Sequence, residues 1–164
     1  MTETKSTMTV STPSDFEIRI SRVFAAPRQL VFDAFTRAEH MQQWWGPKGW
    51  TLPVCKVDLK PGGSFSYTMQ GPAGETHDCS GEYIEVSPPE RVVYTDGFDA
   101  PAMADYASTV TVVFEELEPK LTRITLTSVF KSKEIRDAIV KMGFGEGWGE
   151  SFERLDEVFE TAAV

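Results

Sequence analysis

The side chains best suited to metal or nucleophile chemistry are few in this chain. It contains two cysteines, Cys55 and Cys79, and two histidines, His40 and His77. These four residues could in principle bind zinc, but protein zinc sites draw their ligands from closely spaced pairs such as CxxC or HxxxH, and no such pair occurs here. We therefore predict no metal site, no cofactor and two free thiols.

His77 and Cys79 are two residues apart, so on a β-strand their side chains would share one face. A histidine beside a thiol suggests a cysteine nucleophile with its base. However, the sequence offers no third orienting group and no oxyanion donor, and it contains no GxSxG, GxGxxG or phosphate-loop motif. We predict no catalytic residue, and His77 becomes the candidate polar group of a binding site.

Large aromatic side chains are abundant, with 11 Phe, 4 Trp and 4 Tyr. Taken singly, such residues are typical of a hydrophobic core. As a set, they suit the wall of a pocket that is apolar in bulk and forms hydrogen bonds at a few points. The candidate ligand-binding residues are Trp44, Trp45, Trp50, Tyr67, Met69, His77, Tyr83, Tyr94, Phe98, Phe130, Met142, Trp148 and Phe152.

Charge and hydropathy exclude several classes of partner. The 25 acidic and 16 basic residues give a net charge of −9, and the basic residues form no run that could attract a phosphate backbone. The longest apolar run covers only residues 23–26, whereas a membrane-spanning helix needs roughly 18 or more. Residues 1–14 lack the apolar stretch of a secretion signal. We predict no nucleic-acid binding, no membrane insertion and a cytoplasmic location.

The elements that would position these side chains follow from periodicity. Residues 1–14 are rich in Ser and Thr and predict a flexible tail, which leaves one domain over residues 15–164. Alternation over residues 16–24 predicts a strand, and helical spacing predicts two short helices, up to residue 36 and over 39–45. Six further strands are predicted at 52–59, 64–69, 76–86, 91–96, 107–116 and 121–130. Short turns join most of them into an antiparallel meander, with a loop at 97–105.

The C-terminus returns to helix. Residues 131–142 predict one helical segment, and an apolar stripe over residues 148–162 predicts a longer amphipathic helix. One helix ~10 Å across cannot cover a sheet of about seven strands. We therefore predict an α+β fold in which a curved antiparallel sheet wraps the C-terminal helix and leaves a pocket beside it. In the predicted strand order, Cys55 and Cys79 lie two strands apart, about 9.5 Å and too far for a disulfide.

Several motifs resemble the family of proteins homologous to the activator of the heat-shock-protein-ninety ATPase. They are residues 22–27 (RVFAAP), 31–35 (VFDAF), 44–47 (WWGP), 59–65 (LKPGGSF), 81–86 (GEYIEV), 88–94 (PPERVVY) and 142–148 (MGFGEGW). The likeness extends from about residue 15 to residue 161. It implies the helix-grip fold of the START-related, birch-pollen-allergen-like (SRPBCC) superfamily, with a seven-stranded antiparallel sheet around a long C-terminal helix.

The resemblance also implies a capacity to enclose a hydrophobic small molecule. We therefore expect the protein to bind a lipid or an aromatic metabolite in the cavity between sheet and helix. We expect this binding, and not catalysis, to be its function. Two alternatives remain open. The first is a co-chaperone-like contact with the heat-shock-protein-ninety ATPase in a stress response. The family's eukaryotic co-chaperones carry an additional N-terminal domain for this contact, whereas residues 1–14 precede the domain here. The second is a cyclase-like reaction in the same cavity.

Overall fold

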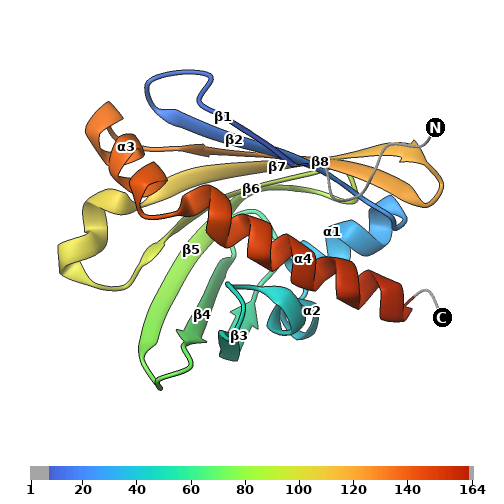
Figure 1. Ribbon diagram of the computed structural model, residues 1–164, viewed down its shortest axis with the longest axis horizontal. Helices are drawn as coiled ribbons and strands as arrows, with labels where there is room; N and C mark the ends of the chain where they lie inside the picture. Colours follow the sequence, from blue (N-terminus) through green and yellow to red (C-terminus); the bar gives the residue numbers. More distant parts are fainter. Residues whose placement is uncertain (1–7, 163–164) are drawn as a thin grey trace.

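The computed structural model describes residues 8–162 and shows one open, eight-stranded antiparallel sheet with a long helix packed across it (Figure 1). The strands are β1 (Met8–Ser11), β2 (Glu17–Phe24), β3 (Thr51–Val57), β4 (Ser64–Gln70), β5 (Thr76–Ser87), β6 (Arg91–Phe98), β7 (Ser108–Glu118) and β8 (Leu121–Val129). The helices are α1 (Arg28–Thr36), α2 (Ala38–Trp44), the 3-10 helix η1 (Pro101–Tyr106), α3 (Lys133–Lys141) and α4 (Phe144–Ala162).

The strand order is β1-β2-β8-β7-β6-β5-β4-β3. Strands β3 to β8 form the predicted meander, because each pairs with the next along the chain. Strand β2 pairs with β8, and the short helices α1 and α2 carry the chain from β2 to β3 at the far edge of the sheet. This arrangement is the α+β helix-grip fold that the sequence predicts.

Three local predictions need correction. Residues 8–11 are not part of a flexible tail: they form β1, which pairs with β2 from Met8↔Arg22 to Ser11↔Arg19 and raises the strand count to eight. A short edge strand is held by main-chain hydrogen bonds, so a polar composition does not exclude it. Residues 1–7 lie outside the described part of the chain. The predicted loop at 97–105 begins inside β6 and contains η1, and α4 begins at Phe144, before the predicted stripe.

The core lies where α1, α2 and the second half of α4 meet the sheet. Trp44 has no exposed surface, and its indole Nε1 donates a 2.9 Å hydrogen bond to the Ala34 carbonyl oxygen. Phe152 and Phe159 of α4 pack edge-on against Phe24 of β2, with ring centroids 5.3 and 5.7 Å apart. At this end of the molecule the space between helix and sheet is therefore filled.

A buried ion pair fixes α4 to the sheet. The guanidinium of Arg22 on β2 donates two hydrogen bonds, of 2.7 and 2.6 Å, to the carboxylate of Asp156. Arg22 is only 4% exposed, and its guanidinium lies 4.8 Å from the centroid of the Phe24 ring. A bidentate pair of this kind specifies orientation, so it sets both the position and the rotation of α4.

A second contact ties α4 to the segment after α2. The Arg154 guanidinium donates hydrogen bonds of 2.9 and 3.1 Å to the carbonyl oxygens of Gly46 and Pro47. Gly46 has a φ of +101°, a conformation that glycine adopts without steric cost. The tight turn at Gly46 therefore presents its carbonyl to α4, and it places Trp45 beside the helix.

The Arg22–Asp156 pair predicts a large and specific loss of stability. Asp156→Ala leaves the Arg22 guanidinium buried without its partner, and we expect the free energy of unfolding to fall by about 3–5 kcal/mol. Urea denaturation measures the change. Glu153→Ala on the same helix is the control, because Glu153 forms an exposed pair with Lys48 and its loss should matter little. Equal losses in the two variants would contradict a special role for the buried pair.

Candidate functional site

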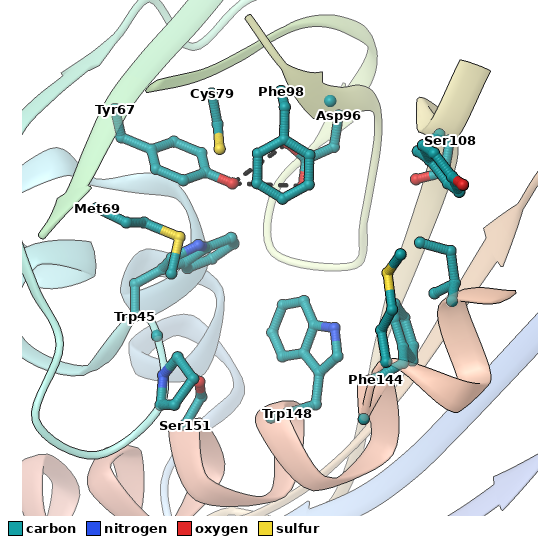
Figure 2. A pocket seen from close by; sticks show the side chains of 18 of the residues that line it. Trp45, Tyr67, Met69, Cys79, Asp96, Phe98, Ser108, Phe144, Trp148 and Ser151 are labelled. Atoms are coloured by element: carbon teal, nitrogen blue, oxygen red, sulfur yellow. Dashed lines mark hydrogen bonds between the residues drawn. The ribbon is translucent and has the colours of Figure 1, made fainter. Parts of the chain in front are cut away.

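A pocket of about 290 Å³ lies between the sheet and the first half of α4 (Figure 2). At ~30 Å³ per molecule, its volume corresponds to roughly ten waters. Its walls come from the segment after α2, from β4 to β7 and η1, from the residue after β8, and from α3 and α4 with the turn between them. The lining residues are Trp45, Gly46, Pro47, Tyr67, Met69, Cys79, Asp96, Gly97, Phe98, Tyr106, Ser108, Phe130, Ile139, Met142, Gly143, Phe144, Gly147, Trp148 and Ser151.

The pocket exists because the inward-facing side chains of α4 differ in size along the helix. Phe144, Gly147, Trp148 and Ser151 follow the i, i+3, i+4, i+7 spacing of one helix face, and all four line the pocket. A Cβ atom added at Gly147 would meet no atom within 4 Å. The small residues therefore leave open space at this end, whereas Phe152 and the apolar residues after it close the other end.

Seven of the lining residues carry aromatic rings, and several of these rings contact one another. The rings of Trp45 and Trp148 meet edge to face with centroids 5.4 Å apart, and Trp45 meets Tyr67 at 5.8 Å. Phe130 and Phe144 form a further edge-to-face pair at 6.3 Å. These contacts come from four separate segments of the chain, so neighbouring rings restrain one another and the wall is preformed.

One ionisable acid belongs to this wall. Asp96 on β6 accepts a hydrogen bond from the Tyr67 hydroxyl, which lies 3.2 Å from one carboxylate oxygen and 3.5 Å from the other. Burial raises the pKa of Asp96 from 3.8 to about 7, and the hydrogen bonds from Tyr67 and the Gly97 N–H only partly oppose this shift. The carboxyl group therefore titrates near neutral pH.

Cys79 lies beside this pair but is unsuited to act as a nucleophile. Burial, followed by the negative charge of Asp96, raises the pKa of its thiol to about 12, so the thiolate that would react is scarce at neutral pH. Both cysteines are free, as predicted, and β4 separates the strands that carry them. Over residues 8–162, no three His, Cys, Asp or Glu side chains come together in a group that could hold a metal ion.

The structure brings many of the predicted ligand-binding residues to this pocket. They are Trp45, Tyr67, Met69, Phe98, Phe130, Met142 and Trp148. Trp44 and Phe152 are instead fully buried in the core. Tyr83 and Tyr94 are buried against Phe65, with ring centroids 5.3 and 5.4 Å from it. The Tyr94 hydroxyl is buried and has no hydrogen-bond partner.

Trp50 and His77 belong to a neighbouring hollow of about 500 Å³, which shares Pro47, Met69 and Phe98 with the pocket. Their rings stack with centroids 5.7 Å apart. His77 is exposed, because it lies near the β4–β5 turn, and that hairpin extends beyond the cover of α4 (Figure 1). The prediction that His77 is the polar group within the pocket wall therefore needs correction: Asp96 and Tyr67 occupy that position.

Asp96 is not among the predicted binding residues, although its place in the sequence carries a signal. Tyr94, Asp96 and Phe98 alternate along one strand, so side chains at these positions share a face. A carboxylate between two aromatic residues that are expected to point inward is unusual, because an unpaired buried charge is unfavourable. The missed lining residues also include Ser108, which is the register partner of Asp96 on β7, and the small residues of α4.

The raised pKa of Asp96 predicts a pH-dependent effect of its removal. The folded protein binds more protons than the unfolded chain between about pH 4 and 7, so this group lowers stability as the pH rises through that window. Asp96→Asn should therefore raise the free energy of unfolding at pH 8, by up to about 4 kcal/mol at roughly 1.36 kcal/mol per pH unit. Urea denaturation of both proteins at pH 4 and pH 8 measures the difference. An equal increment at both values would contradict the assignment.

Known proteins share this architecture. A family model described as Activator of Hsp90 ATPase homolog 1-like protein matches residues 25–160. The chain is similar to a solved protein from Nitrosomonas europaea, with 28% identity, a TM-score of 0.82, and 93% of this chain and 99% of that chain covered. A protein from Mycobacterium smegmatis is 27% identical at a TM-score of 0.83, with 94% and 98% covered.

The likeness in fold extends to more distant proteins. The AHSA1 protein from Silicibacter pomeroyi is 23% identical and has a TM-score of 0.74, with 89% of this chain and 99% of that chain covered. No protein of curated function matches the chain. Within residues 8–162, no helix combines the length and the apolar character needed to cross a membrane. The family match spans most of the chain, so the protein belongs to the family of Activator of Hsp90 ATPase homolog 1-like proteins, within the SRPBCC superfamily.

Proposed function

We propose that the protein binds a small, largely apolar molecule in the pocket between the sheet and α4. The observation that supports this most directly is the pocket itself: about 290 Å³ of space, lined mainly by apolar side chains with seven aromatic residues among them, in a domain whose other end is tightly packed. Ligand sites are typically concave, mostly apolar and equipped with a few polar groups. The Tyr67–Asp96 pair supplies such groups here.

Apolar burial would provide most of the affinity. A ligand that loses ~200 Å² of apolar surface gains about 5 kcal/mol, from which the loss of its translational and rotational freedom is subtracted. Because the rings of the wall already contact one another, little additional ordering is needed when the ligand enters. Met142 is 62% exposed and Phe98 is 38% exposed, and both line the pocket. We assign these two residues to its mouth.

The side chains in the pocket favour binding over catalysis. General acid–base chemistry usually needs two groups with different proton affinities in reach of one substrate. Asp96 is suited to proton transfer near neutral pH, but its neighbours Tyr67 and Cys79 both have pKa values raised by burial. The Tyr67 hydroxyl and the Cys79 thiol therefore remain protonated, and they serve better to orient a ligand than to exchange protons with it.

Filling the pocket from α4 tests the proposal. In Gly147→Leu the added side chain enters space in which a Cβ meets no atom within 4 Å, and leucine favours helix by roughly 0.8 kcal/mol over glycine. We expect the variant to be folded and at least as stable as the original protein, but to bind the neutral fluorescent probe N-phenyl-1-naphthylamine at least tenfold more weakly. Fluorescence titration gives the affinity, and thermal unfolding gives the stability.

Gly147→Ala is the matched control, because it brings the same kind of helix stabilisation with only a methyl group in the pocket. We expect it to retain most of the probe affinity. Unchanged affinity in Gly147→Leu would show that the probe binds elsewhere. Failure of the original protein to bind the probe at all would contradict the proposed function.

A further inference from the structure

The charge on the pocket wall has one sign only. Among the described residues that line it, Asp96 is the only carboxylic acid, and none is Lys, Arg or His. Most of the remaining wall is aromatic or aliphatic. A ligand anion would therefore meet no cationic side chain in the pocket, whereas a ligand cation would meet both a carboxylate and aromatic rings.

We propose that the ligand of this pocket is an organic amine, whose ammonium group contacts the Asp96 carboxylate and whose apolar body lies against Trp45 and Trp148. This inference rests on the proposed function and names its ligand class. Figure 2 shows Tyr67, Cys79, Asp96 and Phe98 on the sheet side of the pocket, with Trp148 and Ser151 facing them from α4. The two chemical parts of an amine thus have separate places in the pocket.

The Asp96 carboxylate is positioned to receive a donor. The Tyr67 hydroxyl and the Gly97 N–H donate to this carboxylate, and its two oxygens have further acceptor sites. An ammonium group supplies additional donors, and the resulting charge-assisted hydrogen bonds are stronger than neutral ones. Aromatic faces attract cations as well, most strongly those of Trp. Trp45 and Trp148 therefore suit the region around an ammonium group better than aliphatic side chains would.

The electrostatic field around the pocket also favours a cation. Asp96, Asp99 and Asp78 all act in the same direction on Cys79, each raising the pKa of its thiol. The chain as a whole carries a net charge of −9. Negative potential of this kind raises the local concentration of cations and repels anions. A fatty acid, which carries a carboxylate, is disfavoured by the same field.

The N-terminus of α4 does not reverse this preference. A helix N-terminus carries partial positive charge and attracts anions, and Phe144 and Gly147 of the first turn line the pocket. However, α3 ends at Lys141, so the negative end of α3 lies next to the positive end of α4, with Gly143 between them. Glu146 in the first turn of α4 further offsets the positive end.

Three molecules with one phenyl body and different charges test the proposal. We would measure binding of 4-phenylbutylamine, 4-phenylbutanol and 4-phenylbutyrate at pH 8 by isothermal titration calorimetry. We expect the amine to bind at least tenfold more tightly than the alcohol, and the carboxylate to bind most weakly. In Asp96→Asn, amine affinity should fall about 10- to 100-fold, the range expected for a charge-assisted hydrogen bond, with little change for the alcohol.

Asp99→Asn is the matched control. Asp99 lies three positions after Asp96 and lines the neighbouring hollow, not this pocket. It accepts a hydrogen bond from the Ser80 hydroxyl, and the side-chain oxygen of asparagine can accept the same bond. We expect this variant to retain the preference for the amine. Because Asp96→Asn is expected to be more stable than the original protein, lost binding in that variant would not reflect unfolding, and thermal unfolding checks this.

The pH dependence provides a second measurement. The charge of Asp96 acts on Tyr67 on β4, on Cys79 and Tyr83 on β5, and on Tyr94 on β6. Burial is the largest cause that raises the pKa of each of these four groups, so they stay neutral from pH 6 to pH 8. Ionisation of Asp96 alone should then make amine binding about tenfold tighter at pH 8 than at pH 6. Asp96→Asn should remove this dependence.

The outcomes separate the two proposals. Equal binding of the three molecules, or tighter binding of the carboxylate, would overturn the amine assignment. Absence of amine binding in a protein that binds N-phenyl-1-naphthylamine would overturn it as well, while the proposed pocket function would stand. Absence of binding of every probe, including N-phenyl-1-naphthylamine, would contradict both proposals.

Discussion

The structure depends on how one helix is held across a sheet that is wider than the helix. The bidentate Arg22–Asp156 pair joins β2 to α4 in a largely apolar setting, and Arg154 joins α4 to the turn at Gly46. Arg154 and Asp156 lie two positions apart on α4, so the two contacts together restrain the rotation of the helix and its position along the sheet. Any inward-facing position of α4 that carries a small side chain therefore leaves space, because the rest of the core cannot shift to occupy it.

The distribution of side-chain size along α4 then separates stability from function. Phe152, Leu155 and Phe159 fill the space beneath the second half of the helix and supply core burial. Gly147 and Ser151 leave the space beneath the first half open, and Trp148 supplies an aromatic wall beside them. The same helix thus supports both a packed core and a pocket without interruption of its backbone.

Asp96 shows the same separation in electrostatic terms. A carboxyl group with a pKa raised to about 7 by burial lowers the stability of the folded state at neutral pH. Stability alone would favour an apolar or amide side chain at this position, and groups with strongly shifted pKa values concentrate at functional sites. A bound ammonium group would replace the water that the carboxylate loses on burial, so the proposed ligand would offset the cost of burying this group.

Local periodicity in the sequence determined the elements, because alternation and helical spacing state directly which residues a strand or helix buries. Together with turns between most successive strands, it also determined the meander, the covering helix and the separation of Cys55 from Cys79. The tertiary structure decided which inward-facing residues line space and which fill it: Trp44 and Phe152 pack solidly in the core, whereas Trp45 and Trp148 line the pocket. It also placed His77 outside the pocket and Asp96 inside it. His77 and the buried Cys79 share one face of β5, and alternation along the strand does not show that the sheet extends beyond α4 at His77. The sequence did not predict the pairing of β1 with β2, because main-chain hydrogen bonds hold an edge strand and these bonds depend little on the side-chain pattern.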